Sequence, residues 1–371
     1  MKSIRFWLFI ALLGIWACST DDGSSSNDDD DNSVTFDRKA MLTNWADNLI
    51  IPAYEDFAVR LNTMQSAYAA FSTDANEANL TTLRTAWLEA YKSWQYVSMY
   101  EIGPAETANY RMQMNTYPTD TDAIDQFTTS GSYDLAAEAN FDAKGFPALD
   151  YLLNGMAATD AEIIASFDTN TRNLTSDIID DMIALTTTVV NGWKGTYRDE
   201  FVNNSGASAT ASTDRFVNDY IYYFEKYLRA GKMGIPIGAF TGTPAPQTLE
   251  AYYSPQNSKI LFLAGLTASQ DFFNGKHFGS SAKGESLASY LVALNSVKDG
   301  DELNEIINAQ FDTARSYVSA LGTFKDEIEN NASPTDMLLA YDEVQRIIPL
   351  LKVDMVSAMS ISIDYVDADG D

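Results

Sequence analysis

Apolar residues recur every three to five positions through most of the 371-residue chain. That spacing places apolar side chains on one face of an α-helix, so the sequence predicts helices almost throughout. We interpret the aromatic residues of these stripes as core residues and not as part of a cofactor site. The stripes run over Met41–Phe71, Leu80–Trp94, Leu174–Trp193, Phe216–Tyr227, Leu303–Leu321 and Leu338–Met355.

Two prolines interrupt these stripes, and no segment alternates as clearly as a β-strand does. Pro52 and Pro349 each predict a bend in a long helix, because proline lacks the N–H group that the helix interior needs. Residues Ser360–Val366 alternate weakly, but they directly continue a helix. The predicted fold class is therefore all-α.

Three segments lack helical periodicity and are predicted to be loops: Ile102–Phe127, Asn203–Thr213 and Ala230–Lys259. The second has low complexity and suits a hinge, which divides the globular part into residues 34–203 and 204–371. The third is long and rich in glycine and proline. Long ordered loops in compact proteins are more often functional than idle.

The N-terminal segment predicts export and lipidation. Residues 1–17 combine a basic start with a short apolar run, as a signal peptide does, and the run is too short for a stable membrane span. A small residue before Cys18 resembles the cleavage site of bacterial lipoproteins, so we expect Cys18 to carry the lipid. An ordinary secretory signal with an incidental cysteine is the alternative.

An acidic stretch, "STDDGSSSNDDDDN", follows Cys18 and contains no apolar residue. Such a composition cannot bury enough apolar surface to become ordered, which predicts a flexible tether over residues 18–33. It resembles the signal that exports some lipoproteins of Bacteroidetes-type bacteria to the cell surface. A plain solvated spacer is the simpler interpretation.

The chain is strongly acidic, with 52 Asp and Glu residues against 24 Lys and Arg residues and a formal net charge of −28 at pH 7. Only six of the acidic residues lie in the tether, so the acidity belongs mainly to the globular part. This charge repels nucleic acid and anionic membrane surfaces. Cations and basic partners are the expected ligands, although solubility alone also explains the charge.

Cys18 is the only cysteine and His277 the only histidine. No disulfide can form within the chain, and a zinc site of cysteines and histidines is excluded. The sequence also lacks the HExxH and GxSxG motifs, and no motif places a histidine base near a serine. Hydrolase activity is therefore not expected.

Several blocks of sequence occur in a characteristic order: "RTAWLEAYKSWQ" leading to "IGP" with Gly103 and Pro104, then "MNTYPTD", "KGFPALDYLLNG", "AGKMGIPIG" and the terminal "DYVDADGD". Their order and spacing resemble the imelysin-like family, bacterial envelope proteins linked to iron uptake, some of them described as metallopeptidases. The resemblance implies two helical bundles packed side by side, with the family's conserved loops meeting near their interface.

The block "KGFPALDYLLNG" departs from the family, whose motif there is G-x-H-x-x-E. Gly145 matches the glycine, but Pro147 stands at the histidine position and Asp150 at the glutamate position. Proline has no donor atom, and this chain cannot supply the two or three imidazoles usual in hydrolytic zinc sites. We therefore expect a protein that binds its target and does not cleave it.

If a metal ion binds, its ligands should be oxygen atoms, which favours a hard cation such as Ca²⁺, Mg²⁺, Mn²⁺ or Fe(III). Asp120, Asp122 and Asp125 have a spacing that allows them to converge on one ion, although they do not match an EF-hand loop. The simpler interpretation is a helix N-terminus, where aspartates interact favourably with the helix dipole.

Asp150 has two interpretations. In the structural one it lies in the first or second turn of a helix and bonds to a backbone amide or to a basic side chain such as Arg111 or Lys232, since a buried carboxylate must be paired. In the other it retains a ligand-binding role. We expect Tyr117, Asp120, Arg111 and Lys232 near Asp150, because each lies in a block that resembles the family.

These expectations combine into one hypothesis. The protein is a lipid-anchored, non-catalytic lipoprotein of the outer membrane, surface-exposed or facing the periplasm, that binds a cation, an iron species or an iron-uptake component. The link to iron comes from the resemblance alone. A metallopeptidase of the imelysin type and a partner-docking scaffold without a small ligand are the alternatives.

Overall fold

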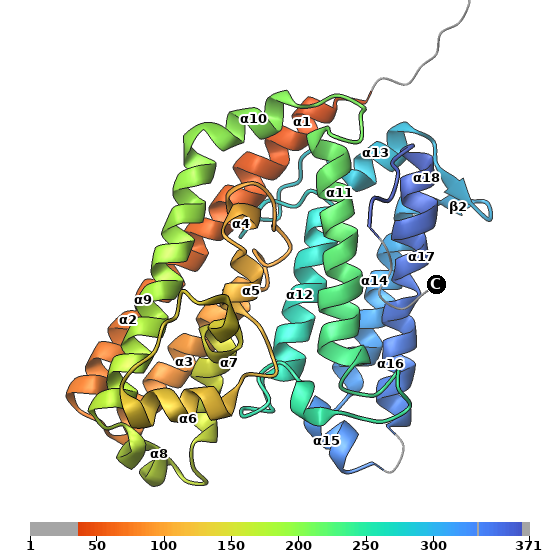
Figure 1. Ribbon diagram of the computed structural model, residues 1–371. Helices are drawn as coiled ribbons and strands as arrows, with labels where there is room; N and C mark the ends of the chain where they lie inside the picture. Colours follow the sequence, from red (N-terminus) through yellow and green to blue (C-terminus); the bar gives the residue numbers. More distant parts are fainter. Residues whose placement is uncertain (1–35, 332–333, 366–371) are drawn as a thin grey trace, which may run out of the picture. The chain divides into compact units, whose positions relative to one another are not determined.

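The computed structural model describes residues 36–331 and 334–365, and this part of the chain is almost entirely helical (Figure 1). The all-α prediction is confirmed. The predicted signal peptide, Cys18 and the acidic tether lie outside the described residues, and so does the terminal "DADGD". Every helix in the described ranges is too short or too polar to cross a membrane.

The helices of the first half of the chain are α1 (Arg38–Asn44), η1 (Trp45–Ile50), α2 (Ile51–Thr73), α3 (Glu77–Trp94), α4 (Pro104–Thr107), α5 (Tyr110–Met114), α6 (Thr121–Ser130), η2 (Glu138–Ala143), α7 (Gly145–Asp150), η3 (Tyr151–Gly155), α8 (Asp160–Ser166), α9 (Thr169–Gly192), η4 (Trp193–Tyr197) and α10 (Arg198–Asn203). Those of the second half are α11 (Ser212–Tyr222), η5 (Tyr223–Gly234), η6 (Pro246–Thr248), α12 (Ser258–Phe273), α13 (Leu287–Ala293), α14 (Leu303–Ala320), α15 (Phe324–Glu329), α16 (Thr335–Gln345), α17 (Ile347–Pro349), η7 (Leu350–Met355) and α18 (Val356–Ala358). The η segments are π-helical, except η2 and η6, which are 3-10 helices.

In the first half, α2 packs against both α3 and α9 (Figure 1). The predicted apolar stripes form the contact. The buried ring of Phe57 on α2 lies 5.6 Å from that of Trp94 on α3 and 6.0 Å from that of Phe146 on α7, measured between ring centroids. Burial of each such side chain contributes about 1.5–3 kcal/mol relative to exposure.

In the second half, α14 packs against α12 and α16, while α11 continues into η5 beside α12. Aromatic rings again fill the contacts: Phe224 of η5 lies 5.5 Å from Phe311 of α14, and Phe262 of α12 lies 5.8 Å from Phe324 of α15. These helices stand beside the first group in the ribbon view (Figure 1).

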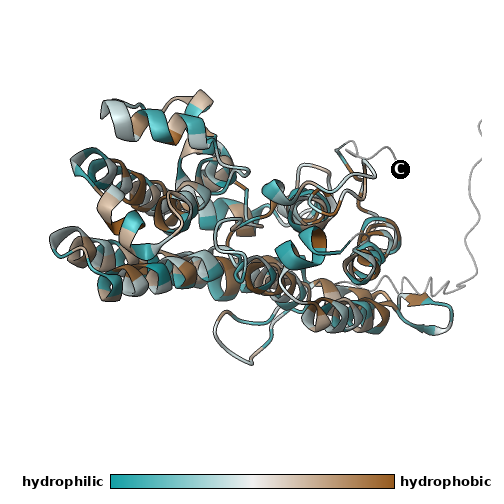
Figure 2. Cartoon of the chain, turned by 90° about the horizontal axis from the view of Figure 1, so that it is seen from below, coloured by the Kyte–Doolittle hydropathy of each residue, from teal (hydrophilic) through white to brown (hydrophobic). Residues whose placement is uncertain are grey.

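Side chains from both halves share one core. The Trp45 ring of η1 lies 5.4 Å from Phe216 of α11 and 4.8 Å from Phe272 of α12. Viewed along the helices, hydrophobic faces turn toward neighbouring helices and hydrophilic faces turn outward (Figure 2). The described residues belong to one compact unit, so the division between residues 203 and 204 stays a prediction.

Two predicted loops contain more regular structure than expected. In the segment 102–127, Gly103 adopts φ +56° and Pro104 begins α4, while Asp120 caps α6. In the segment 230–259, η5 continues to Gly234 before the chain becomes irregular. Proline at a first helical position and an aspartate cap start short helices that have no apolar stripe of their own.

A two-residue hairpin was also not predicted. Strand β1 (Val297–Lys298) pairs antiparallel with β2 (Asp301–Glu302). Its turn is formed by Asp299 and Gly300, both at positive φ, which suits an Asp-Gly turn between antiparallel strands. Strands of this length are too short to show an alternating pattern.

Several long helices change to π geometry along their course. The chain stays helical from Arg38 to Thr73 because η1 joins α1 to α2, and Pro52 is the second residue of α2. The bend predicted at Pro52 therefore coincides with a π-helical segment just before it. π-helical segments occur frequently at functional sites, and η5 is one that carries candidate residues.

Gly145→Ala should destabilise the protein. Gly145 has φ +71°, and a Cβ atom there would lie 2.3 Å from the backbone oxygen of Met114. We expect the free energy of unfolding of the full chain to fall by roughly 2 kcal/mol or more, because left-handed backbone strain adds to a backbone clash. Urea denaturation measures the loss.

The matched control is Gly206→Ala, since nothing lies within 4 Å of a Cβ atom placed there. It should change the free energy of unfolding by less than about 0.5 kcal/mol. Equal effects of the two substitutions would contradict the prediction.

Candidate functional site

Asp150 is buried at the end of α7, and its carboxylate binds the loop that precedes α12. Its Oδ2 atom accepts a hydrogen bond from the backbone N–H of Tyr253 at 2.8 Å, and Oδ1 accepts one from the Ser254 hydroxyl at 2.6 Å. The side-chain amide of Asn154 donates to Oδ1 at 3.1 Å. Both carboxylate oxygens therefore hold residues 253–254 against α7.

The electrostatics of Asp150 follow from this burial. Removal from water raises the pKa of Asp150 to about 6, and the hydrogen bonds from Ser254, Tyr253 and Asn154 oppose the increase. The predicted bond to a backbone amide is present, but it comes from a distant loop and not from the helix that carries Asp150. The predicted pairing with Arg111 or Lys232 is wrong, because each of these binds other carboxylates.

Lys232 of η5 forms a buried ion pair with Glu250, which lies on the same loop as Ser254. Two side-chain amides donate to Oε1 of Glu250, from Gln95 at 3.3 Å and from Asn115 at 2.8 Å. Burial lowers the pKa of Lys232, and the negative charge of Glu250 opposes that change. The loop is thus fixed to η5 through Glu250 and to α7 through Tyr253 and Ser254.

Two tyrosines, Tyr91 and Tyr117, lie within the electrostatic reach of Glu250. The hydroxyl of Tyr91 donates to the side chain of Asn115. Burial raises the pKa of Tyr91 well above its usual value, and Glu250, Tyr117 and Asp150 raise it further. Burial and Glu250 also raise the pKa of Tyr117. The charges of Asp150 and Glu250 thus both act on Tyr91, and the expected proximity of Tyr117 to Asp150 stays a prediction.

Arg111 lies in a cluster of its own. Its Nε donates to the Ser98 carbonyl at 2.8 Å, its guanidinium lies 3.6 Å from the Asp219 carboxylate, and it covers the Tyr227 ring at 4.4 Å from the centroid. The backbone N–H of Arg111 donates to both carboxylate oxygens of Glu101 at 3.0 Å. Burial raises the pKa of Glu101 to about 7, although Arg111 lowers it.

Of the three aspartates of the segment 120–125, two lie at the start of α6 and the third, Asp125, lies farther along the helix. Asp120 accepts a hydrogen bond from the backbone N–H of Ala123 at 3.0 Å, Asp122 lies exposed in the first turn, and Asp125 accepts from the Tyr151 hydroxyl at 2.9 Å. Within the described ranges, no group of three or more His, Cys, Asp or Glu side chains is arranged to hold a metal ion. The interpretation as a helix N-terminus is confirmed for Asp120, which caps α6, and for Asp122, which lies in its first turn, whereas Asp125 binds Tyr151.

The glycines and prolines of the motif blocks have packing roles. A Cβ atom on Gly103 would lie 2.1 Å from the Tyr197 ring, and one on Gly192 would lie 2.5 Å from the side chain of Pro104. Pro147 is buried within α7 and offers no atom for a metal or a proton.

Comparison with known proteins identifies the family. The family model for imelysin, a peptidase family, matches residues 50–350 of this chain, well over half of its length. The chain belongs to the imelysin family. Iron-regulated protein A of Synechococcus elongatus is 25% identical over 127 residues, which are 33% of this chain and 34% of that protein. The match thus spans about a third of the length of that curated relative.

Two solved structures share the fold of this imelysin-family protein. One is described as an iron-regulated protein A precursor from Parabacteroides distasonis, with a TM-score of 0.70 and 15% identity over 86% of this chain and 95% of that one. The other is an imelysin-like protein from Psychrobacter arcticum, with a TM-score of 0.68 and 16% identity over 88% of this chain and 97% of that one. At these identities the likeness shows the fold alone.

Sequence reasoning missed the loop residues that bind Asp150 and Lys232. Glu250, Tyr253 and Ser254 bind Lys232 and Asp150, but no motif marks them. The available signal was their position in the long segment 230–259, because long ordered loops in compact proteins are often functional.

Removing one partner of the buried Lys232–Glu250 pair should cost more than removing both. Lys232→Met leaves the Glu250 carboxylate buried without its cation, and we expect a loss of about 3–5 kcal/mol in the free energy of unfolding. The double variant Lys232→Met/Glu250→Gln leaves no buried charge and should lose less than Lys232→Met alone. Urea denaturation of the full chain measures these two variants and the single variant Glu250→Gln, and losses that add up would contradict the coupling.

Asp150 should make stability increase as the pH falls. Its pKa is about 6 in the folded protein against 3.8 for an unperturbed aspartate, so the native state binds the proton more tightly. The cost of burying the charge is therefore present above pH 6 and is relieved as the pH falls toward 4. Asp150→Asn cannot titrate. The free energy of unfolding of wild type should therefore rise by roughly 2.4 kcal/mol relative to that of this variant between pH 8 and pH 4.

Denaturation at a series of pH values measures this gap. Asp122→Asn, which removes an exposed carboxylate, is the matched control for the loss of one aspartate. If the difference in the free energy of unfolding between wild type and Asp150→Asn stayed constant with pH, Asp150 would not titrate in this range.

Proposed function

We propose that this protein is a lipid-anchored envelope member of the imelysin family that binds its target without cleaving it, in association with iron or metal uptake. One observation carries the proposal. Pro147 has no donor atom, and the Asp150 carboxylate is used to hold Tyr253 and Ser254. In a hydrolytic metal site, side chains at these positions would instead face the metal and leave one coordination position open.

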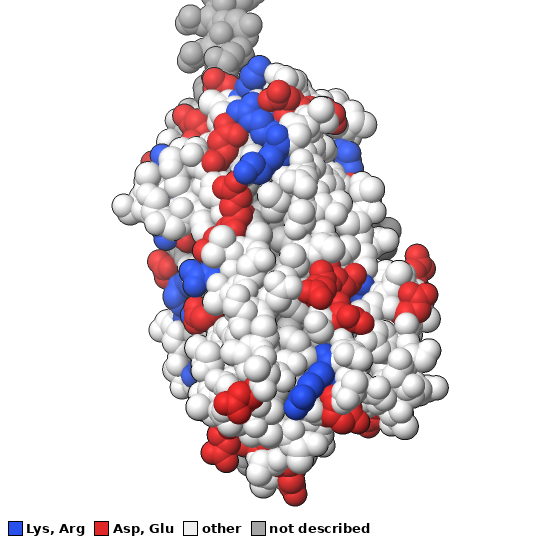
Figure 3. Space-filling model, turned by 90° about the vertical axis from the view of Figure 1, so that its left-hand side faces the viewer, with Lys and Arg blue, Asp and Glu red and all other residues white. Residues whose placement is uncertain are grey.

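The charge of the protein supports a cationic or basic target. The formal net charge is −28, and Figure 3 shows acidic side chains in several groups on one face, with basic side chains among them. Such a field favours cations and basic protein segments and disfavours nucleic acid. A hard cation such as Ca²⁺, Mg²⁺, Mn²⁺ or Fe(III), or an iron-uptake component with a basic surface, fits this requirement.

The iron association rests on relatives. Iron-regulated protein A is the name of the curated relative and part of the name of one structural neighbour. Lipidation at Cys18 would attach the protein to the outer membrane, facing the periplasm or exposed on the surface. The peptidase designation of the family supports the alternative function, a metallopeptidase.

A cleavage assay separates the two functions. The mature full chain, supplied in turn with Zn²⁺, Mn²⁺ and Fe²⁺, should not cleave a denatured protein substrate above background, because the motif supplies no imidazole. A family member that retains the histidine and glutamate of the motif is the positive control. Metal-dependent cleavage that is lost in Asp150→Ala would overturn the proposal in favour of a metallopeptidase.

The same preparations identify the class of target. Elemental analysis of protein purified without chelator, and thermal shifts with Ca²⁺, Mg²⁺, Mn²⁺ and Fe(III), should reveal a bound hard cation if the cation is the direct ligand. No bound metal and no shift with any of these ions would exclude direct cation binding and leave a protein partner as the target.

A further inference from the structure

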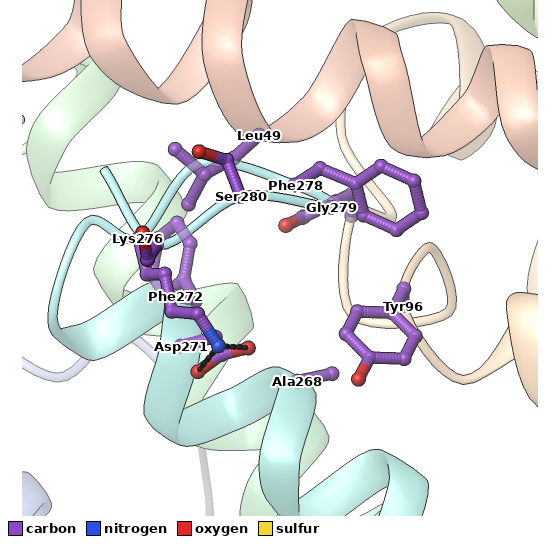
Figure 4. A pocket seen from close by; sticks show the side chains of 11 residues that line it. Leu49, Tyr96, Ala268, Asp271, Phe272, Lys276, Phe278, Gly279 and Ser280 are labelled. Carbon is purple, nitrogen blue, oxygen red and sulfur yellow. Dashed lines mark hydrogen bonds and ion pairs between the residues drawn. The ribbon is translucent and has the colours of Figure 1, made fainter. Parts of the chain in front are cut away.

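A cavity of about 560 Å³ lies where the end of α12 and the loop after it meet η1 and the turn after α3 (Figure 4). It shares no lining residue with the Asp150 network, and both predicted halves of the chain contribute to it. Small-molecule sites in proteins have volumes of about 300–1,000 Å³. The cavity is therefore large enough for a small organic ligand.

The loop that closes the cavity is held in place from outside it. The backbone N–H of Phe278 donates to the carbonyl of Asn48 at 2.8 Å. The side-chain amide of Asn44 donates to the carbonyls of Gly275 and Glu285, both at 3.1 Å. Because η1 and the end of α1 position this loop, the cavity is formed before a ligand arrives, which lowers the entropic cost of binding.

Aromatic rings form one wall of the cavity. The half-buried rings of Tyr96 and Phe278 meet edge to face, with centroids 5.5 Å apart and an interplanar angle of 81°. Two further rings of the cavity, Tyr100 and Phe272, are buried, with centroids 6.1 Å apart, and Phe272 lies on the opposite side, beside Asp271 (Figure 4). Rings that are only half buried leave aromatic surface free, and aromatic groups pack against such surface with specific geometry.

An ion pair faces this wall. Lys276 lies 3.0 and 3.2 Å from the two carboxylate oxygens of Asp271, and Figure 4 shows the pair on one side of the cavity and the rings of Tyr96 and Phe278 on the other. Burial and the charge of Asp271 raise the pKa of Tyr96, while Arg315 opposes the increase. Asp271 therefore lies close enough to act on the far wall.

This ion pair is exchangeable. The Lys276 side chain is 37% exposed and that of Asp271 is 25% exposed. Pairs with this exposure contribute only about 0–1 kcal/mol to stability. A ligand that offers both an ammonium and a carboxylate can replace each partner while keeping both protein charges paired.

We propose that this cavity binds a small aromatic zwitterion of the amino-acid class, with its ring against Tyr96 and Phe278, its ammonium on Asp271 and its carboxylate on Lys276. A ligand with only a negative charge would be repelled by this strongly acidic protein. A ligand with only a positive charge would bind Asp271 and leave Lys276 without a carboxylate partner. A zwitterion satisfies both members of the pair. This site is separate from the Asp150 region and goes beyond the proposed function.

Isothermal titration calorimetry on the mature full chain in detergent tests the proposal, with L-tryptophan, L-tyrosine and L-phenylalanine as probes. At least one should bind saturably with one site per chain. Indole, which lacks both charges, and glycine, which lacks the ring, should each bind at least about tenfold more weakly, a difference of about 1.4 kcal/mol.

Two variants locate the binding. Phe278→Ala removes part of the aromatic wall and Lys276→Met removes the carboxylate anchor, and each should weaken binding at least about tenfold. Tyr317→Ala truncates an exposed aromatic side chain on α14 that does not line the cavity and should leave binding unchanged. Both cavity variants change partly exposed side chains, and circular dichroism checks that they remain folded.

Three results would overturn the proposal. The first is no saturable binding of any aromatic amino acid. The second is binding that both cavity variants retain. The third is equal binding of indole and the best amino acid, which would show that the ion pair takes no part.

Discussion

The carboxylate of Asp150 cannot be buried in the interior without donors, because an unpaired charge there would cost several kcal/mol. One donor, Asn154, lies four residues away, and the other two come from Tyr253 and Ser254, about a hundred positions later in the chain. This single requirement ties α7, in the first half of the chain, to the loop before α12, in the second half. The packing of the two helical groups around the motif depends on it.

The same loop explains why a second charged pair lies nearby. Once Tyr253 and Ser254 are held against α7, Glu250 lies opposite η5, where Lys232 neutralises it. Side-chain amides of Gln95 and Asn115 complete the hydrogen bonding of Glu250, so residues from α3 to η5 form one polar network. The hydrogen bonding of this network is complete at Glu250 but not at Gln95, whose Oε1 atom is buried without a hydrogen-bond partner.

The side chains at the motif positions have a structural role in this chain. In the family pattern, a histidine and a carboxylate one helical turn apart can point together at a metal ion. Here the histidine position holds a buried proline, and the carboxylate satisfies a backbone amide and a hydroxyl. In this chain the carboxylate of the motif therefore acts as an attachment point for a loop.

The sequence by itself determined the helical class and the apolar faces of the long helices, and its single histidine excludes a site that needs two or more imidazoles, because periodicity and residue type are local properties. It also placed Asp120 correctly at a helix start, since a cap needs only neighbouring residues. Only the tertiary structure decided that Asp150 binds Ser254 and that Lys232 binds Glu250. Those partners are distant in sequence. The packing of the helices decides which carboxylate lies next to which buried donor, and no spacing along the chain encodes that choice.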